Sequence, residues 1–129
     1  MIVVDASALG PAVADDGVSG DRARARLRGE RLVAPCQLDL ELLSMFRRLA
    51  HAGVDERRLI RAVQQVARLR VRRMLHLPLL PRIWMLRANV TPYDAVYVAL
   101  AEALDLPLIT ADARLAGAPG VRCEVELLS

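Results

Sequence analysis

Short apolar runs alternate with longer stretches of helical periodicity along this chain. The first run, Ile2 to Val4, is rich in β-branched residues and stops at Asp5, which is typical of a short buried strand. Similar runs predict further strands at residues 31–34, 108–110 and 121–125. Amphipathic or apolar stretches predict helices at residues 7–14, 21–28, 37–52, 55–69, 79–88 and 92–104. Residues 70–77 fit neither pattern.

Two of the predicted helices have especially clear signals. The helix at 37–52 has apolar residues at spacings of four, three and four, which form one stripe: Leu38, Leu42, Met45 and Leu49. The helix at 92–104 opens with Thr91-Pro92-Tyr93-Asp94, in which threonine suits the N-cap, proline the first helical position and aspartate the third. This second helix is apolar on nearly all sides, so we expect it to be buried.

The alternation of strands and helices sets the expected fold class. Parallel strands need a crossover between them, usually a helix, so alternation predicts a mainly parallel sheet with helices on both faces. This is a three-layer α/β/α arrangement. The chain has 129 residues, of which 54% are hydrophobic, which is enough for one core without disulfide or metal staples. We therefore expect residues 1–129 to form a single domain.

The composition excludes several classes of site. All 18 basic residues are arginine, because the sequence contains no lysine. Walker A sites, Schiff-base enzymes and receiver-type acidic pockets each depend on a lysine and are therefore excluded. The formal net charge of +3 is compatible with a nucleic-acid partner but does not by itself indicate one.

The N-terminus and the apolar runs bear on location. The start of the chain lacks the basic residues and the long apolar run of a signal peptide, and no stretch reaches the roughly 18 apolar residues of a membrane span. We therefore expect a cytoplasmic protein with no membrane contact. The two cysteines, Cys36 and Cys123, are too isolated for a zinc site, and we expect them to be buried thiols.

Four acidic residues stand where functional groups gather in open parallel sheets, near the carboxyl ends of strands. Asp5 ends the first predicted strand, and Asp112 follows the strand at 108–110. Glu41 lies early in the helix at 37–52, and Asp94 lies in the first turn of the helix at 92–104. The fold class therefore predicts that these four side chains share one edge of the sheet.

Each of the four acids also has a purely structural alternative. Asp5 can cap the helix that follows it, a role open to Ser7 as well, and Asp94 fits a capping box with Thr91. Glu41 flanks an apolar stripe, where a solvated carboxylate is ordinary, and Asp112 lies in a sequence that suits a turn. Taken singly, none of the four identifies a site.

Taken together, the four acids indicate a cation. Two carboxylates about 4 Å apart repel one another by roughly 4 kcal/mol at an effective dielectric constant near 20, so a pocket of four needs a compensating charge. Oxygen ligands without histidine or cysteine favour a hard ion that keeps part of its water shell. Mg²⁺ or Mn²⁺ is therefore the expected cofactor, and a phosphate-containing molecule the expected substrate.

Four segments resemble, in order and in spacing, the successive motifs of PIN-domain proteins of the VapC toxin type. They are VVDASAL at 3–9, VAPCQLDLELLSMFRRL at 33–49, LRANVTPYDAVYVALAEALDLPLIT at 86–110 and TADARLA at 110–116. The resemblance implies a PIN-like fold. It also implies that the catalytic and metal-binding residues are Asp5, Glu41, Asp94 and Asp112, with Ser7 and Thr110 as polar residues that support the pocket.

The same resemblance implies an activity and partners. Proteins of this type hydrolyse RNA phosphodiester bonds and act as the toxin of a toxin–antitoxin pair. A bound metal ion would activate a water and neutralise charge on the phosphate, and either Glu41 or Asp94 would take the proton, with one or two ions present. A homodimer and a small VapB-like antitoxin are the implied protein partners.

Other polar and aromatic residues receive simpler interpretations. Arginine forks suit phosphate, so the helix face that carries Arg57, Arg61 and Arg68 is a candidate RNA contact, with a merely solvated face as the alternative. Asp39 is interpreted as a first-turn residue that favours the helix dipole. The tryptophan and the two tyrosines are expected in the core or an interface: Trp84, Tyr93 and Tyr97.

The main alternative function is a catalytically inactive PIN-like module that binds RNA or protein, and the presence of all four acids disfavours it. A haloacid-dehalogenase-like phosphohydrolase requires an Asp-x-Asp motif, but residue 7 is serine, and it also requires a lysine. A dinucleotide-binding fold is disfavoured because no Gly-x-Gly-x-x-Gly sequence follows the first strand.

Overall fold

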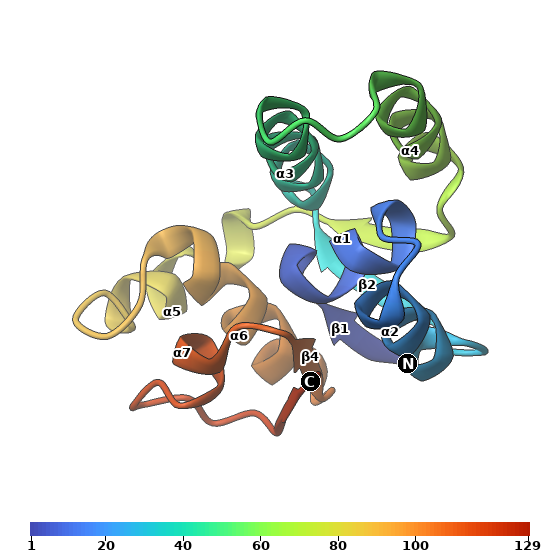
Figure 1. Cartoon of the computed structure of the whole chain (residues 1–129). Helices are drawn as coiled ribbons and strands as arrows, with labels where there is room; N and C mark the ends of the chain where they lie inside the picture. Colours follow the sequence, from blue (N-terminus) through green and yellow to red (C-terminus); the bar gives the residue numbers. More distant parts are fainter.

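The computed structural model describes residues 1–129 and has a five-stranded sheet at its centre (Figure 1). The strands are β1 (Ile2–Val4), β2 (Leu32–Pro35), β3 (Val71–Met74), β4 (Leu108–Thr110) and β5 (Val125–Leu127). Their order is β3-β2-β1-β4-β5, and every neighbouring pair is parallel. The order reverses next to β1, and ligands of such sheets bind at that point, outside the carboxyl ends of the strands.

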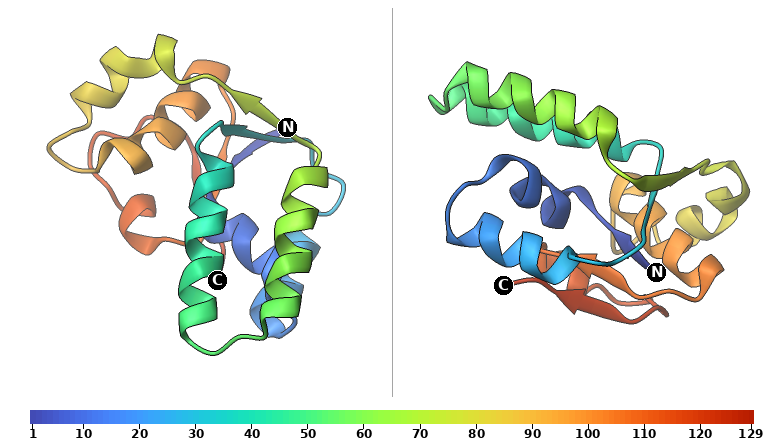
Figure 2. Two further views of the ribbon diagram at one scale, coloured as in Figure 1. Left: turned by 90° about the horizontal axis from the view of Figure 1, so that it is seen from above. Right: turned by 90° about the vertical axis from the view of Figure 1, so that its right-hand side faces the viewer.

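Helices cover both faces of the sheet (Figures 1 and 2). On one side lie α1 (Ala6–Ala14), α2 (Val18–Leu27), α3 (Leu38–His51) and α4 (Glu56–Arg68), of which α3 and α4 form an antiparallel pair. On the other side, the 3-10 helix η1 (Leu77–Leu79) and α5 (Leu80–Met85) pack against α6 (Pro92–Leu104). A short helix, α7 (Ala113–Ala116), follows β4. The predicted three-layer α/β/α arrangement is confirmed.

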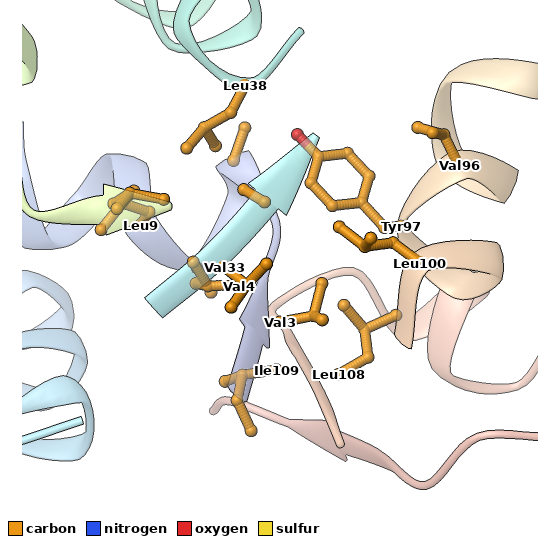
Figure 3. Close-up of a cluster of buried hydrophobic side chains, with 14 of the residues drawn as sticks. Val3, Val4, Leu9, Val33, Leu38, Val96, Tyr97, Leu100, Leu108 and Ile109 are labelled. Carbon is orange, nitrogen blue, oxygen red and sulfur yellow. The ribbon is translucent and has the colours of Figure 1, made fainter. Parts of the chain in front are cut away.

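The hydrophobic core lies between these layers. The central strands contribute side chains that are almost completely buried, as expected for parallel strands covered on both faces. Figure 3 shows Leu9 and Leu38 on one side of these strands and Val96, Tyr97 and Leu100 of α6 on the other. Residues 95–101 of α6 are all buried, so the all-round apolar sequence of this helix is accounted for. No helix combines the length and the apolar character that crossing a bilayer requires.

Two strands differ from the sequence prediction. β3 lies within residues 70–77, where Arg72 and Arg73 conceal the strand pattern, because an edge strand can turn charged side chains outward. The strand predicted at 121–125 is wrong except for its last residue. The register with β4 pairs Val125 with Leu108, and the residues before it form a turn in which the backbone N–H of Arg122 donates to Glu102.

The helix predicted at 79–88 is also shorter than expected. It consists of η1 and α5, and regular helix ends at Met85. The residues that follow turn back toward the C-terminal part of the chain, where Asn89 donates a hydrogen bond to the Pro119 carbonyl. The helix predicted at 21–28 begins earlier, at Val18.

Four side chains that the sequence could place in the core lie nearer to solvent. Cys36 is exposed in the turn between β2 and α3, and Cys123 is only half-buried, so the prediction of two buried thiols is wrong. Trp84 is 65% exposed and lies under the Arg87 guanidinium, whose carbon is 4.6 Å from the ring centroid. Tyr93 is exposed as well, whereas Tyr97 is buried. Trp84 and Tyr93 are therefore not core residues.

Candidate active site

A pocket of about 200 Å³ opens beside the carboxyl ends of β1 and β4, between α3 and the first turn of α6. All four acids singled out from the sequence line it: Asp5, Glu41, Asp94 and Asp112. They come from four separate parts of the chain. The parallel sheet brings them together, because β1 and β4 are neighbours and end at the same edge.

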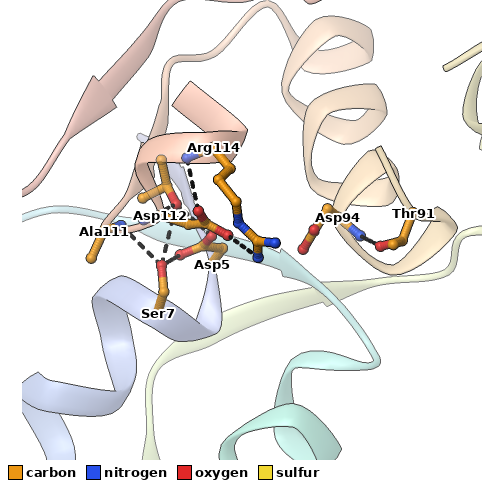
Figure 4. Close-up of polar contacts among 8 residues, drawn as sticks. Asp5, Ser7, Thr91, Asp94, Ala111, Asp112 and Arg114 are labelled. Carbon is orange, nitrogen blue, oxygen red and sulfur yellow. Dashed lines mark hydrogen bonds and ion pairs between the residues drawn. The ribbon is translucent and has the colours of Figure 1, made fainter. Parts of the chain in front are cut away.

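Asp5 lies at the closed end of this pocket and is 5% exposed. Its Oδ1 accepts hydrogen bonds from the Ala8 backbone N–H at 3.1 Å and from Ser7 Oγ at 2.7 Å, and its Oδ2 accepts one from Thr110 Oγ1 at 2.6 Å (Figure 4). Asp5 is therefore the N-cap of α1, and Ser7 is not. Burial raises the pKa of Asp5 despite these three donors, so its charge is costly where it stands.

Ser7 and Thr110 connect the ends of β1 and β4. Ser7 Oγ accepts a hydrogen bond from the Ala111 N–H at 2.9 Å, and Thr110 Oγ1 accepts one from the Asp112 N–H at 3.0 Å. Since both hydroxyls also donate to Asp5, each fixes one carboxylate oxygen while holding the loop that carries Asp112. Ser7 and Thr110 therefore lie where they can orient Asp5 and hold the loop that carries Asp112.

Asp112 and Asp94 lie on the more open side of the pocket. Asp112 is the N-cap of α7 and accepts from the Arg114 N–H at 2.9 Å, with the Arg114 guanidinium 3.4 Å from its other oxygen. Burial opposes the ionisation of Asp112, but these contacts outweigh it and lower its pKa. Burial first, and then the charge of Asp112, raise the pKa of Asp94. Figure 4 shows the Arg114 guanidinium between the two carboxylates.

The capping box predicted at α6 is only half formed. Thr91 accepts a hydrogen bond from the Asp94 N–H at 3.3 Å and is the N-cap of α6. The Asp94 carboxylate lines the pocket and does not return to the Thr91 backbone N–H, although the Thr91 side chain and the Arg114 charge act to lower its pKa. Helix capping therefore explains the hydrogen bond of the Asp94 N–H but not the position of its carboxylate in the pocket.

Glu41 is held from two sides. Its Oε1 accepts hydrogen bonds from Tyr97 Oη at 2.7 Å and from Gln37 Nε2 at 2.8 Å, and Gln37 also donates to the Tyr93 carbonyl at 2.7 Å. Burial is the largest influence on Glu41 and raises its pKa, with the charges of Asp94 and Asp5 acting in the same direction. The bonds from Tyr97 and Gln37 oppose that rise. The bonds from Tyr97 to Glu41 and from Gln37 to the Tyr93 carbonyl tie α3 to α6.

Sequence reasoning missed several residues at this site. Tyr97 and Gln37 hold Glu41 but carry no signal that separates them from core and surface residues. Ser44 and Arg48 also line the pocket, and their helical spacing from Glu41 could have identified them.

Two other sequence predictions concern residues outside the pocket. Arg57, Arg61 and Arg68, the candidate RNA contact, do not line it. Asp39 does lie in the first turn of α3, but its carboxylate binds the Arg73 guanidinium at 2.8 Å.

The donor set fits a hard divalent cation. The pocket offers four carboxylates and no histidine or cysteine, and Asp5, Glu41 and Asp94 all have raised pKa values in its absence. A bound cation would lower these pKa values, because it favours the ionised form of each carboxyl group. No three acidic, histidine or cysteine side chains are grouped closely enough to ligate one ion by themselves. Waters would therefore complete the coordination shell, as is usual for Mg²⁺.

For the RNA cleavage that the sequence resemblance implies, with Glu41 taking the proton, Tyr97→Phe is expected to move the acid limb of the pH–rate profile to higher pH. Removing the hydroxyl takes away a hydrogen bond that lowers the pKa of Glu41, so a higher pH is needed to ionise it. A hydrogen bond to a charged group is worth about 1.5–3 kcal/mol, which corresponds to a reaction slower by a factor of roughly 10 to 150 on the acid side. Initial cleavage rates over a pH series measure the shift. Tyr93→Phe is the control, and an identical shift in both variants would rule out this role for Tyr97.

Comparison with known proteins identifies one family. The model of the PIN domain matches residues 2–121. Ribonuclease VapC9 of Mycobacterium tuberculosis is 44% identical over 132 residues, which cover 99% of this chain and 98% of that protein. Ribonuclease VapC1 of the same species is 43% identical over 128 residues, which cover 98% of this chain and 96% of that protein.

Solved structures show the same fold at lower sequence identity. The crystal structure of Mycobacterium tuberculosis VapC20, a sarcin-ricin loop cleaving toxin, matches with a TM-score of 0.71 at 16% identity and covers 95% of this chain and 99% of that chain. PAE2754 from Pyrobaculum aerophilum matches with a TM-score of 0.65 at 22% identity and covers 96% of this chain and 81% of that chain. With the family model and full-length relatives in agreement, the chain belongs to the PIN-domain family and to its VapC type.

Proposed function

We propose that this chain is an endoribonuclease that hydrolyses RNA phosphodiester bonds with Mg²⁺ or Mn²⁺, and that it is the toxin of a type II toxin–antitoxin pair. The observation that carries this proposal is the position of Asp5, Glu41, Asp94 and Asp112 around one pocket. The names of the relatives support the reaction, because proteins 43–44% identical to this chain over nearly their whole length are called ribonucleases.

The residues of the pocket divide into distinct roles under this proposal. A divalent cation, when bound, would lower the pKa of a water and neutralise charge on the scissile phosphate. Asp5, Asp94 and Asp112 would hold it in part through water molecules, with Asp5 oriented by Ser7 and Thr110. Glu41 is the better placed of the two candidate bases, because Tyr97 and Gln37 fix one of its oxygens and leave the other free to take a proton.

Incubation of total cellular RNA with the purified chain tests this function. Parallel reactions contain Mg²⁺, Mn²⁺ or EDTA, and an Asp94→Asn protein purified in the same way controls for contaminating nucleases. We expect discrete fragments with either metal and none with EDTA or the variant. Fragments that persist in EDTA would contradict the metal requirement. Intact RNA after incubation with folded wild-type protein and metal would favour the inactive binding module instead.

We also propose a cognate VapB-like antitoxin, a homodimer and a cytoplasmic location. The antitoxin follows from the VapC type of the relatives, and the location follows from the RNA substrate. The homodimer is supported by large apolar side chains exposed on η1, α5 and the start of α6, because exposed apolar side chains on neighbouring elements are typical of interaction surfaces. These are Leu77, Leu80, Trp84, Met85 and Tyr93. A monomeric mass by sedimentation equilibrium would contradict the homodimer.

A further inference from the structure

The pocket has an arginine on the same helix face as Glu41. Ser44 and Arg48 follow Glu41 by three and seven positions on α3, so the three residues share one face, and all of them line the pocket. A rise of 1.5 Å per residue places the Arg48 backbone about 10 Å beyond Glu41 along the helix. Arg48 therefore lies at the outer end of the wall whose inner end is Glu41.

The Arg48 side chain leans back toward the acids. Long side chains on a helix point toward its N-terminus, and Arg48 Nη1 donates to Ser44 Oγ at 3.3 Å, one turn closer to Glu41. Both side chains are exposed to solvent. A guanidinium and a hydroxyl thus stand together beside four carboxylates, as adjacent hydrogen-bond donors.

Arg48 has no carboxylate partner, unlike the other guanidinium at the pocket. Arg114 is held by Asp112, whereas Arg48 forms no ion pair and has a single long hydrogen bond to a neutral oxygen. Most of its five N–H donors are therefore available to an incoming anion. An unpaired guanidinium at the rim of an acidic pocket suits phosphate, which it binds through two parallel hydrogen bonds.

The proposed reaction creates a need for this group. An RNA strand in the pocket would bring further phosphates on either side of the scissile one, and a divalent cation would neutralise charge only where it is bound. A neighbouring phosphate that passes along α3 would be repelled by the Glu41 carboxylate unless a positive group lies close to that phosphate. We propose that Arg48, with Ser44 as a second donor, binds the phosphate next to the scissile one. This inference rests on the proposed function and assigns the path of the RNA strand along α3.

The chain offers a matched control in Arg47. It precedes Arg48 on α3, is equally exposed, and forms no ion pair or hydrogen bond with another side chain, but it lies outside the pocket. Substitution of Arg47 or of Arg48 by glutamine removes one positive charge from the same stretch of helix. Any difference between the two variants therefore reports position and not net charge.

The test measures binding, so that it does not depend on cleavage. Asp94→Asn is the cleavage-inactive parent, and a short fluorescein-labelled single-stranded RNA of mixed sequence is the probe, followed by anisotropy in Mg²⁺ over a series of salt concentrations. Arg48→Gln added to the parent is expected to weaken binding about tenfold at low salt. It should also reduce the slope of log Kd against log salt by about 0.7, the value for one phosphate contact on a single strand. Arg47→Gln added to the parent should change neither quantity.

The outcomes distinguish the phosphate contact of Arg48 from the proposed RNA cleavage, on which it rests. Equal effects of Arg48→Gln and Arg47→Gln, no effect of Arg48→Gln, or a parent that does not bind the probe at low salt would each overturn the role of Arg48. Metal-dependent cleavage by the wild type together with any of these results leaves the nuclease intact. Conversely, an Arg48-specific loss of binding in a chain whose wild type never cleaves RNA would contradict the nuclease and keep the phosphate contact. Circular dichroism confirms that both variants are folded.

Discussion

Asp5→Asn is expected to slow RNA cleavage by at least about 100-fold while changing the free energy of unfolding of the metal-free protein by no more than about 1 kcal/mol. The amide oxygen of asparagine can still accept from the Ala8 N–H and cap α1. What is lost is a charge that would hold the cation and one acceptor for Thr110. Because burial raises the pKa of Asp5, removing its charge also relieves a desolvation penalty, which offsets the lost hydrogen bond.

Two measurements on the same preparation check this result: the initial rate of cleavage in Mn²⁺ and a urea unfolding curve. Asp39→Asn is the control, because it removes another carboxylate near the end of a strand, one that pairs with Arg73 and lies outside the pocket. We expect its cleavage rate to stay within about twofold of the wild type. If Asp5→Asn lost activity only because it unfolded, Asp5 would have a capping role alone.

Mn²⁺ is expected to stabilise the wild-type protein strongly. A ligand present at one hundred times its Kd stabilises a fold by about 2.7 kcal/mol, which for a domain of this size raises the melting temperature by roughly 10 °C. The reason is that burial, with a smaller contribution from neighbouring carboxylates, raises the pKa values of Asp5, Glu41 and Asp94, so a cation would offset the cost of their charges. Thermal unfolding with and without Mn²⁺ measures the effect, and EDTA should reverse it.

This stabilisation should grow as the pH rises. The three raised pKa values mean that the folded state binds more protons than the unfolded state at pH values above the ordinary carboxyl range. These groups therefore contribute less to stability as the pH rises through their folded pKa values in the metal-free protein. Protons compete with the cation for the same oxygens. A Mn²⁺ effect that is independent of pH, or that persists in Asp5→Asn, would place the ion elsewhere.

Local patterns predicted the parts of the fold that are determined locally. The β-branched run before Asp5, the stripe on α3 and the Thr91-Pro92 opening of α6 each depend on neighbouring residues, and each lies where the sequence indicated. β3 and β5 are edge strands with little of the apolar pattern of the central ones. Their positions follow from pairing with β2 and β4, which a single sequence does not reveal.

The site shows the same division between local and long-range information. The four acids could be selected because each follows a strand or begins a helix, and alternation of elements implied a shared edge. Their partners could not be selected in this way. The bond from Tyr97 to Glu41 joins residues 56 positions apart, and that from Thr110 to Asp5 joins residues 105 apart. Such contacts depend on how the layers pack.

For Asp5 and Asp112, the capping role and the role in the pocket are compatible. Asp5 and Asp112 each cap a helix, and both line the pocket. Because an N-cap places its carboxylate at the positive end of a helix, capping fixes these side chains where the sheet edge needs them. The same position of the carboxylate therefore serves both helix capping and the pocket. Substitution by asparagine retains the cap and removes the charge, so it separates the contribution of capping from that of metal binding.

The most direct test of the account is a titration of RNA cleavage against Mn²⁺ concentration after the protein has been freed of metal with EDTA. Cleavage is expected to be absent at first and to rise to a plateau. The midpoint of that rise should agree with the Kd for Mn²⁺ obtained from the concentration dependence of thermal stabilisation, and Asp94→Asn should show no rise. Cleavage that is already complete in EDTA, or a plateau as high in Asp94→Asn as in the wild type, would contradict the claim that these four acids form a metal-dependent nuclease site.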